Sequence, residues 1–336
     1  MQSQLPPNSL RKQRGLGSFI SVAVLIGLSL FVRINYQDIA DALRFWAYQP
    51  PTAVSSIVSR SGLSDAGTFA LYSSQPSIEG NQTFNDKCGR QEQNTAILGC
   101  YTNGRIYIYD VTDARLDGIK EVTAAHEMLH AIYQRLSGDE KTSVDKLVEE
   151  EYTKLSSDPA FSERMAFYAR TEPGERDNEL HSIIGTEVST ISPDLEAHYA
   201  KYFTDRSKIL TLFNNYNGAF TSLDTQAKSL QTQLDSLGDQ IKTDSDKYNV
   251  DVKSLNAAIA DFNKRAADGS FTSQAAFTNE RASLQRQVES VTNERDAINS
   301  KIVQFEKLRT QYNDTVTQTH DLYKSIDSNL SPAPKV

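Results

Sequence analysis

The chain has 336 residues, enough for one large domain or two modest ones, and a formal net charge of −8 at pH 7. Acidic and basic residues are interspersed, so no basic stripe is available to neutralise phosphates, and nucleic acid is excluded as an expected partner. The excess of acidic residues favours solubility and indicates nothing further about function.

The first informative segment is an uncharged run at 16–32, LGSFISVAVLIGLSLFV, which basic residues precede and Arg33 closes. The run is just long enough to span a bilayer. A cleaved signal peptide is the competing interpretation, but SLFVRINYQDIA contains no small-residue cleavage site. Residues 1–15 include no acid, so they should stay in the cytoplasm. We therefore expect a single-pass type II protein of the cell membrane, with a transmembrane anchor at 16–34 and an extracytoplasmic remainder.

Residues 35–51 are predicted to form a stalk or juxtamembrane helix, which Pro50-Pro51 ends. The segments at 67–78, 95–100 and 104–111 have the aliphatic and aromatic enrichment of strands, and YTNG forms a turn between the last two. These patterns predict a small, mainly antiparallel sheet.

Two cysteines, Cys88 and Cys100, bracket the sequence GRQEQNTAILG. Their proximity fits a disulfide that closes a loop outside the cell, in agreement with the expected topology. Two buried free thiols are the alternative.

From Asp117 the period of the apolar residues becomes helical, and Gly138 offers a stop. Further helices are predicted at about 141–156, 159–169 and 177–191, separated by SSDP and TEPG. The whole region 52–204 is therefore expected to be an α+β domain.

The C-terminal part, 205–328, carries apolar residues at heptad spacing in two runs of matched length. The sequence RAADGSFTSQAA between the runs can turn the chain, which would pair Phe262 with Phe277. We expect an antiparallel coiled-coil helical hairpin, able to bind a protein partner, followed by a disordered tail at 329–336. Parallel coiled coils in an oligomer are the alternative.

The motif HEMLH at 126–130 lies inside the helix predicted from Asp117. Residues i and i+4 share one helix face, so His126 and His130 can bind a single Zn²⁺ ion. Glu127 is offset from both, which leaves its carboxylate available to take a proton from a zinc-activated water. The residues around the histidines are uncharged, as a ligand helix under a cleft requires. Two solvated histidines on a surface helix are the alternative.

Strands followed by an HExxH helix resemble the zincin metallopeptidases, whose third zinc ligand lies on a later helix. The glycine and third histidine of the metzincins do not follow HEMLH. NELHS at 178–182 is similar to the Asn-Glu-x-x-Ser of thermolysin-like gluzincins, in which the glutamate binds zinc. The resemblance implies Glu179 as the third ligand. The acid that follows the serine in that family is Ile183 here, so its role stays unassigned.

Two other residues compete for the third ligand position. Glu187 lies eight residues after Glu179, about 12 Å along a helix, so only one of the two can reach the ion. Glu187 is the first alternative and His181 the second. A carboxylate that does not bind the ion can instead orient a ligand histidine.

A hydrolytic site also needs a donor for the developing oxyanion. The segment SPDLEAHYAKYFTDR follows the candidate ligands and offers His198 and Tyr199, which we name as catalytic candidates. Packing is the alternative role for both.

Together these patterns predict a membrane-anchored, extracytoplasmic zinc metallopeptidase that hydrolyses peptide or protein substrates with Glu127 as general base. The expected fold class is α+β: an N-terminal transmembrane helix, a small zincin-like domain and a helical hairpin. One alternative is an envelope scaffold whose hairpin is the working part and whose zinc site is structural or inactive. Another is a zinc enzyme that acts on peptidoglycan.

Overall fold

The computed structural model describes residues 14–89, 96–171 and 173–329, which divide into two compact units. Unit 1 contains the described residues up to Asn217 together with those from Ser325 onward, and unit 2 is Gly218–Lys324. Most of the expected cytoplasmic tail (1–15) and of the expected disordered tail (329–336) lies outside the described residues.

The N-terminal helices are α1 (Arg14–Ile34) and α2 (Tyr36–Ala47). The predicted single transmembrane helix is not found: among the described residues, no one helix is long and apolar enough to cross a membrane. Ala23–Ile34 and Tyr36–Ala47 meet that test only as a pair, bent by 72°. The break between the two helices falls at Asn35, whose side-chain amide donates a hydrogen bond of 2.8 Å to the carbonyl of Phe31.

The next part of unit 1 contains the strands. Its elements are α3 (Thr52–Ser61), α4 (Asp65–Ser73), β1 (Ser77–Glu79), α5 (Asn81–Lys87), β2 (Gly99–Thr102) and β3 (Arg105–Tyr109). The strands form a sheet in the order β1-β3-β2, with β1 parallel and β2 antiparallel to β3. Asn103 and Gly104 both have positive φ, as the two-residue turn of a hairpin requires, so the turn predicted at YTNG is confirmed.

The predicted α+β, zincin-like fold class is wrong, because the described residues are mostly helical and contain one sheet of three short strands. The clearest difference is at 67–73, which forms most of α4 instead of a strand. Ser64 caps this helix by accepting a hydrogen bond from the Gly67 amide. A methyl group at Gly67 would lie 2.2 Å from the Tyr202 carbonyl oxygen, so only glycine lets α4 pack this closely.

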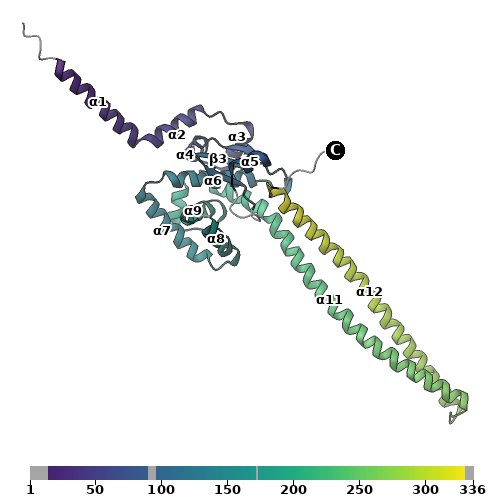
Figure 1. Cartoon of the computed structure of the whole chain (residues 1–336). Helices are drawn as coiled ribbons and strands as arrows, with labels where there is room; N and C mark the ends of the chain where they lie inside the picture. The colour runs from purple at the N-terminus through teal and green to yellow at the C-terminus, as the bar shows by residue number, and fades with distance from the viewer. Residues whose placement is uncertain (1–13, 90–95, 172, 330–336) are drawn as a thin grey trace, which may run out of the picture. The chain divides into compact units, whose positions relative to one another are not determined.

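The second half of unit 1 is helical. Its elements are the 3₁₀ turn η1 (Ala114–Leu116), α6 (Ile119–Arg135), α7 (Gly138–Leu155), α8 (Pro159–Thr171), α9 (Arg176–Glu187), α10 (Pro193–Tyr199) and the first turns of α11 (Arg206–Asp268). Helix α6 contacts β2 and β3 as well as α3, α4 and α9, so it runs through the core of unit 1 (Figure 1). Most of its residues are buried.

Unit 2 consists of the long part of α11 and most of α12 (Gln274–Ile326), which run side by side as a hairpin (Figure 1). The rings of Phe262 and Phe277 lie 5.1 Å apart, so they form the pair that the heptad register predicts. Leu255 and Leu284 extend this small core along the hairpin. The two helices therefore satisfy each other's apolar faces over this stretch.

Helix α9 packs tightly on α6 at Gly185. A methyl group at this position would lie 2.5 Å from Cδ1 of Leu129 and 2.8 Å from the Tyr199 ring. Since both neighbours are fully buried, neither can move away freely.

We predict that Gly185→Ala lowers the free energy of unfolding by about 2 kcal/mol, the usual cost of overpacking, although alanine favours helices. Chemical denaturation of the purified protein measures this change. Gly138→Ala is the matched control, because Gly138 begins α7 and has no neighbouring atom within 4 Å of an added methyl group. Equal stabilities for Gly185→Ala and Gly138→Ala would contradict the packing argument.

Candidate metal centre

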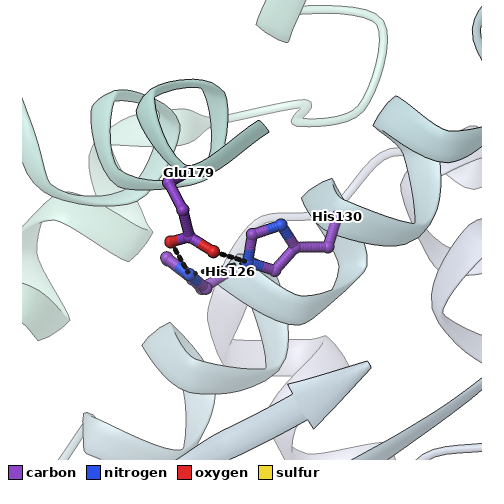
Figure 2. Close-up of side chains that lie close together, drawn as sticks. All are labelled: His126, His130 and Glu179. Atoms are coloured by element: carbon purple, nitrogen blue, oxygen red, sulfur yellow. Dashed lines mark hydrogen bonds and ion pairs between the residues drawn. The ribbon is translucent and has the colours of Figure 1, made fainter. Parts of the chain in front are cut away.

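Three side chains from α6 and α9 converge on one another (Figure 2). His126 and His130 lie one turn apart on α6, and Glu179 faces them from the first turn of α9. Nε2 of His130 lies 3.0 Å from Nε2 of His126 and 3.3 Å from Oε1 of Glu179, and His126 Nε2 lies 3.7 Å from Oε2. All three ligand atoms fall within 4.8 Å of one another, so the group could hold a metal ion.

The chemistry of these atoms fits a cation. Two imidazole nitrogens point at each other across 3.0 Å, and they repel unless a proton or a metal ion lies between them. Oε2 of Glu179 is a buried acceptor that receives no hydrogen bond from any residue the structure describes. Burial would raise the pKa of this carboxyl, but His130 and His126 outweigh burial and hold the pKa below its ordinary value. The carboxylate is therefore ionised and ready to bind a cation.

The remaining ring nitrogen of His130 is oriented by α9. Nδ1 lies 2.9 Å from Oδ1 of Asn178 and 3.2 Å from Oγ of Ser182. The Asn178 oxygen can only accept, so Nδ1 carries the proton and donates a hydrogen bond to it, and the Nε2 lone pair is directed toward the cluster. Asn178 in turn donates a hydrogen bond of 2.9 Å to Glu175, and this bond fixes the orientation of the Asn178 amide. NELHS therefore supplies a ligand and two residues that orient His130.

Glu127 lies beside the cluster and against strand β2. Its side chain is 6% exposed and lines the same cavity as the three ligands. A methyl group at Gly99 would lie 2.8 Å from Oε1 of Glu127 and 2.6 Å from Cγ2 of Thr123. Glycine at this position therefore lets β2 approach the Glu127 carboxylate directly.

The cavity that contains the cluster measures about 470 Å³. Its lining includes residues 96–101, which lead into and include the start of β2. Further lining residues come from α8, the turn before α9 and the beginning of α11, and they include Phe167, Tyr168, Thr171, Glu175 and Tyr216. The cavity is therefore lined by residues of a strand and by aromatic side chains.

Glu187 lines this cavity but is not part of the ligand cluster. Its carboxylate lies 2.5 Å from Nη1 of Arg164 and is 12% exposed. The arginine supplies the positive charge that a metal ion would otherwise provide, and Glu179 occupies the position facing the two histidines. The geometry therefore favours Glu179 over Glu187.

His181, His198 and Tyr199 do not line the cavity; they form a separate buried group. Nε2 of His181 lies 2.9 Å from Nε2 of His198, and the Tyr199 hydroxyl donates a hydrogen bond of 2.7 Å to the His181 carbonyl. These contacts tie α10 to α9. The structure therefore gives His198 and Tyr199 packing partners in place of the cavity position that the sequence predicts.

Tyr168 on α8 is a cavity residue that no sequence pattern singles out. Burial raises the pKa of its phenol well above the ordinary value, and Glu179 and Glu187 raise it further. The phenol therefore stays protonated at neutral pH, and Tyr168 lines the cavity. Its only signal in the sequence is an aromatic pair, Phe167-Tyr168, on a helix without a motif.

The disulfide between Cys88 and Cys100 is formed, with 5.8 Å between the Cα atoms. It joins the end of α5 to the second residue of β2, so it ties the cavity-lining strand to α5. Residues 90–95 of the loop that it closes lie outside the described part of the chain.

Comparison with known proteins identifies no relative: no family model, no curated protein and no solved structure matches the chain.

We predict that Glu179→Gln weakens binding of Zn²⁺, the probe ion, by more than about 100-fold, because even the loss of a residue that orients a ligand costs 10- to 100-fold. Glu187→Gln is the matched control and should bind as the wild type does. Competition titration against a fluorescent chelator measures both affinities. Weaker binding in Glu187→Gln with normal binding in Glu179→Gln would contradict the assignment.

A second prediction concerns acid stability. Burial lowers the pKa of His198 from its ordinary 6.5 to about 4. Protonation therefore favours the unfolded chain, so this contribution to stability is complete above pH 6.5 and is lost as the pH falls toward 4. Between pH 7.5 and pH 5 it should cost about 2 kcal/mol.

The measurement is denaturant unfolding at both pH values with a chelator present. His198→Gln should lose less stability on acidification than the wild type. His320→Gln, at an exposed position in unit 2, should behave as the wild type does. An equal pH dependence in His198→Gln and the wild type would contradict this role of His198.

Proposed function

We propose that the protein is a zinc-dependent metallopeptidase of gluzincin type, in which His126, His130 and Glu179 hold the zinc ion. The observation that carries the proposal is the convergence of these three ligand atoms in one cavity with Glu127 and strand β2. The proposal concerns the site and its chemistry, since the fold is mostly helical.

The choice of zinc rests on the donor set. Two imidazoles and one carboxylate are ligands that zinc takes in catalytic sites, where a fourth position stays open. The cluster offers three ligand atoms among the described residues, and His181 is engaged with His198. When bound, zinc supplies a Lewis acid that polarises a carbonyl and makes water a nucleophile near neutral pH. A structural site would instead be closed by a fourth protein ligand.

The proposed substrate is an extended peptide segment that lies along β2. In the described sheet β2 pairs with β3 on one side only, and 96–101 line the cavity. An extended peptide can add to such an edge through main-chain hydrogen bonds. This placement would bring the scissile carbonyl beside the cluster and the attacking water beside Glu127.

Two side chains have roles in the proposed reaction. Glu127 takes a proton from the attacking water and returns it to the leaving amine, since its carboxylate lies in the cavity but outside the ligand set. Tyr168 donates a hydrogen bond to the substrate oxygen as negative charge develops there. Its raised pKa keeps the phenol protonated at neutral pH.

We propose an extracytoplasmic location for this activity, because structural disulfides persist in oxidising compartments and Cys88 is bonded to Cys100. Attachment to a membrane and the type II orientation stay predictions from the sequence.

A scaffold function is the second candidate, and the length of the helices in unit 2 favours it. A helical hairpin of this kind can bind a protein partner. Such binding is compatible with a peptidase in unit 1, so the two candidates differ in whether the metal site hydrolyses peptides.

We predict that Glu127→Gln lowers the rate of peptide hydrolysis by about 10²- to 10⁴-fold, the usual contribution of a general base, while the zinc content stays at the wild-type level. Digestion of a peptide library of diverse sequence, followed by mass spectrometry, measures the rate whichever bond is cut. Glu150→Gln, at an exposed position on α7, is the matched control. Undiminished cleavage by Glu127→Gln, or no cleavage by the zinc-loaded wild type, would contradict the proposed function.

A further inference from the structure

The feature that the proposed reaction leaves unexplained is a buried ionic contact between α2 and the end of α6. The Asp41 carboxylate on α2 is 3% exposed and accepts two hydrogen bonds from Arg135, at 2.6 and 2.9 Å. Gln37 donates to the same carboxylate. Burial raises the pKa of Asp41, but these donors outweigh burial and lower it, so Asp41 is ionised. Arg135 contributes most to offsetting the cost of burying this charge, and Gln37 and Arg44 contribute less.

Arg135 also reaches the strand that forms the cavity wall. Its Nη1 donates a hydrogen bond of 3.2 Å to the hydroxyl of Tyr101 and one of 2.5 Å to the carbonyl of Ala131. Its guanidinium also lies over the Tyr101 ring. Tyr101 belongs to β2 and lines the cavity. One side chain therefore joins α2, the metal-binding helix α6 and the edge strand β2.

A second contact from α2 supports the hairpin that β2 and β3 form. Arg44 lies against the turn between β2 and β3, where a methyl group at Gly104 would come within 2.6 Å of its Nη1. Helix α2 is itself held against the rest of unit 1. Phe45 packs on Phe69, and just after the helix the Tyr48 hydroxyl donates a hydrogen bond of 2.6 Å to the Pro76 carbonyl. The β2–β3 hairpin is therefore supported by α2, which is itself packed in place.

We propose that Asp41, acting through Arg135 and Tyr101, holds β2 at the distance from α6 that binding of a peptide along this strand requires. Asp41 and Arg135 are then positioning residues, and α2 is a working part of the substrate site. This inference rests on the proposed function for the substrate. The mechanical link between α2 and β2 can be tested without it.

The experiment uses the zinc-loaded full chain as wild type, Asp41→Asn, Tyr101→Phe and the double variant. The matched control is Glu121→Gln, which also changes a buried carboxylate to an amide opposite an arginine. Glu121 is bonded at 2.8 Å to Arg60 of α3 and lies in the first turn of α6, at the opposite end of the helix from Arg135. Loss of stability alone would therefore affect the control as well.

Two readouts are measured for each protein. Steady-state peptide hydrolysis should show KM raised about fivefold in Asp41→Asn and in Tyr101→Phe, because the loss of one hydrogen bond typically weakens binding by about this factor. The values of kcat and zinc content should stay unchanged. Hydrogen–deuterium exchange should show faster exchange of the Gly99–Thr102 amides in both variants. The double variant should be no worse than the more affected single variant, because both changes break the same link. Glu121→Gln should match the wild type in KM and in β2 exchange.

Unchanged KM and unchanged β2 exchange in Asp41→Asn would overturn the inference, as would effects that multiply in the double variant. If the wild type cleaves no peptide, the proposed function fails, and the exchange data alone decide the link between α2 and β2. Wild-type exchange in Asp41→Asn would then contradict that link.

Discussion

The packing of α9 against α6 is the constraint on which the rest of the site depends. His126 and His130 have their spacing from a single helix, but Glu179 reaches them only because α9 comes close to α6. Gly185 permits this approach by leaving no side chain between α9 and Leu129. The same approach brings Asn178 and Ser182 to the Nδ1 of His130. Ligand geometry and ligand orientation thus follow from one helix–helix contact.

Helix α6 combines several functions along its length. Its N-terminal part is held by Arg60, its centre carries the candidate ligands and Glu127, and its last turn carries Arg135. Strand β2 contacts it at Gly99 and again at Tyr101. The proposed metal, base and substrate positions are therefore all defined relative to one buried helix, so their distances from one another are held constant by a rigid element.

The sequence predicts those parts of this arrangement that have a strong local signal. The helical period gives α6, the spacing of HEMLH gives the two histidines, and NELHS gives Glu179. Matched heptads give the Phe262–Phe277 pair. By contrast, an apolar run such as 67–73 has the same composition in a strand and in a buried helix, so α4 follows only from tertiary contacts such as Gly67 against Tyr202. The positions of His198 and Tyr199 escape prediction for a related reason, since the direction of side chains on the short helix α10 depends on its packing against His181.

A crystal structure of the zinc-loaded protein with anomalous diffraction at the zinc edge tests the central claim most directly. We expect one zinc peak per chain, about 2.0–2.2 Å from Nε2 of His126, Nε2 of His130 and a carboxylate oxygen of Glu179, with the remaining position open to the cavity. A zinc ion enclosed by four protein ligands, or bound away from these three residues, would contradict a catalytic site.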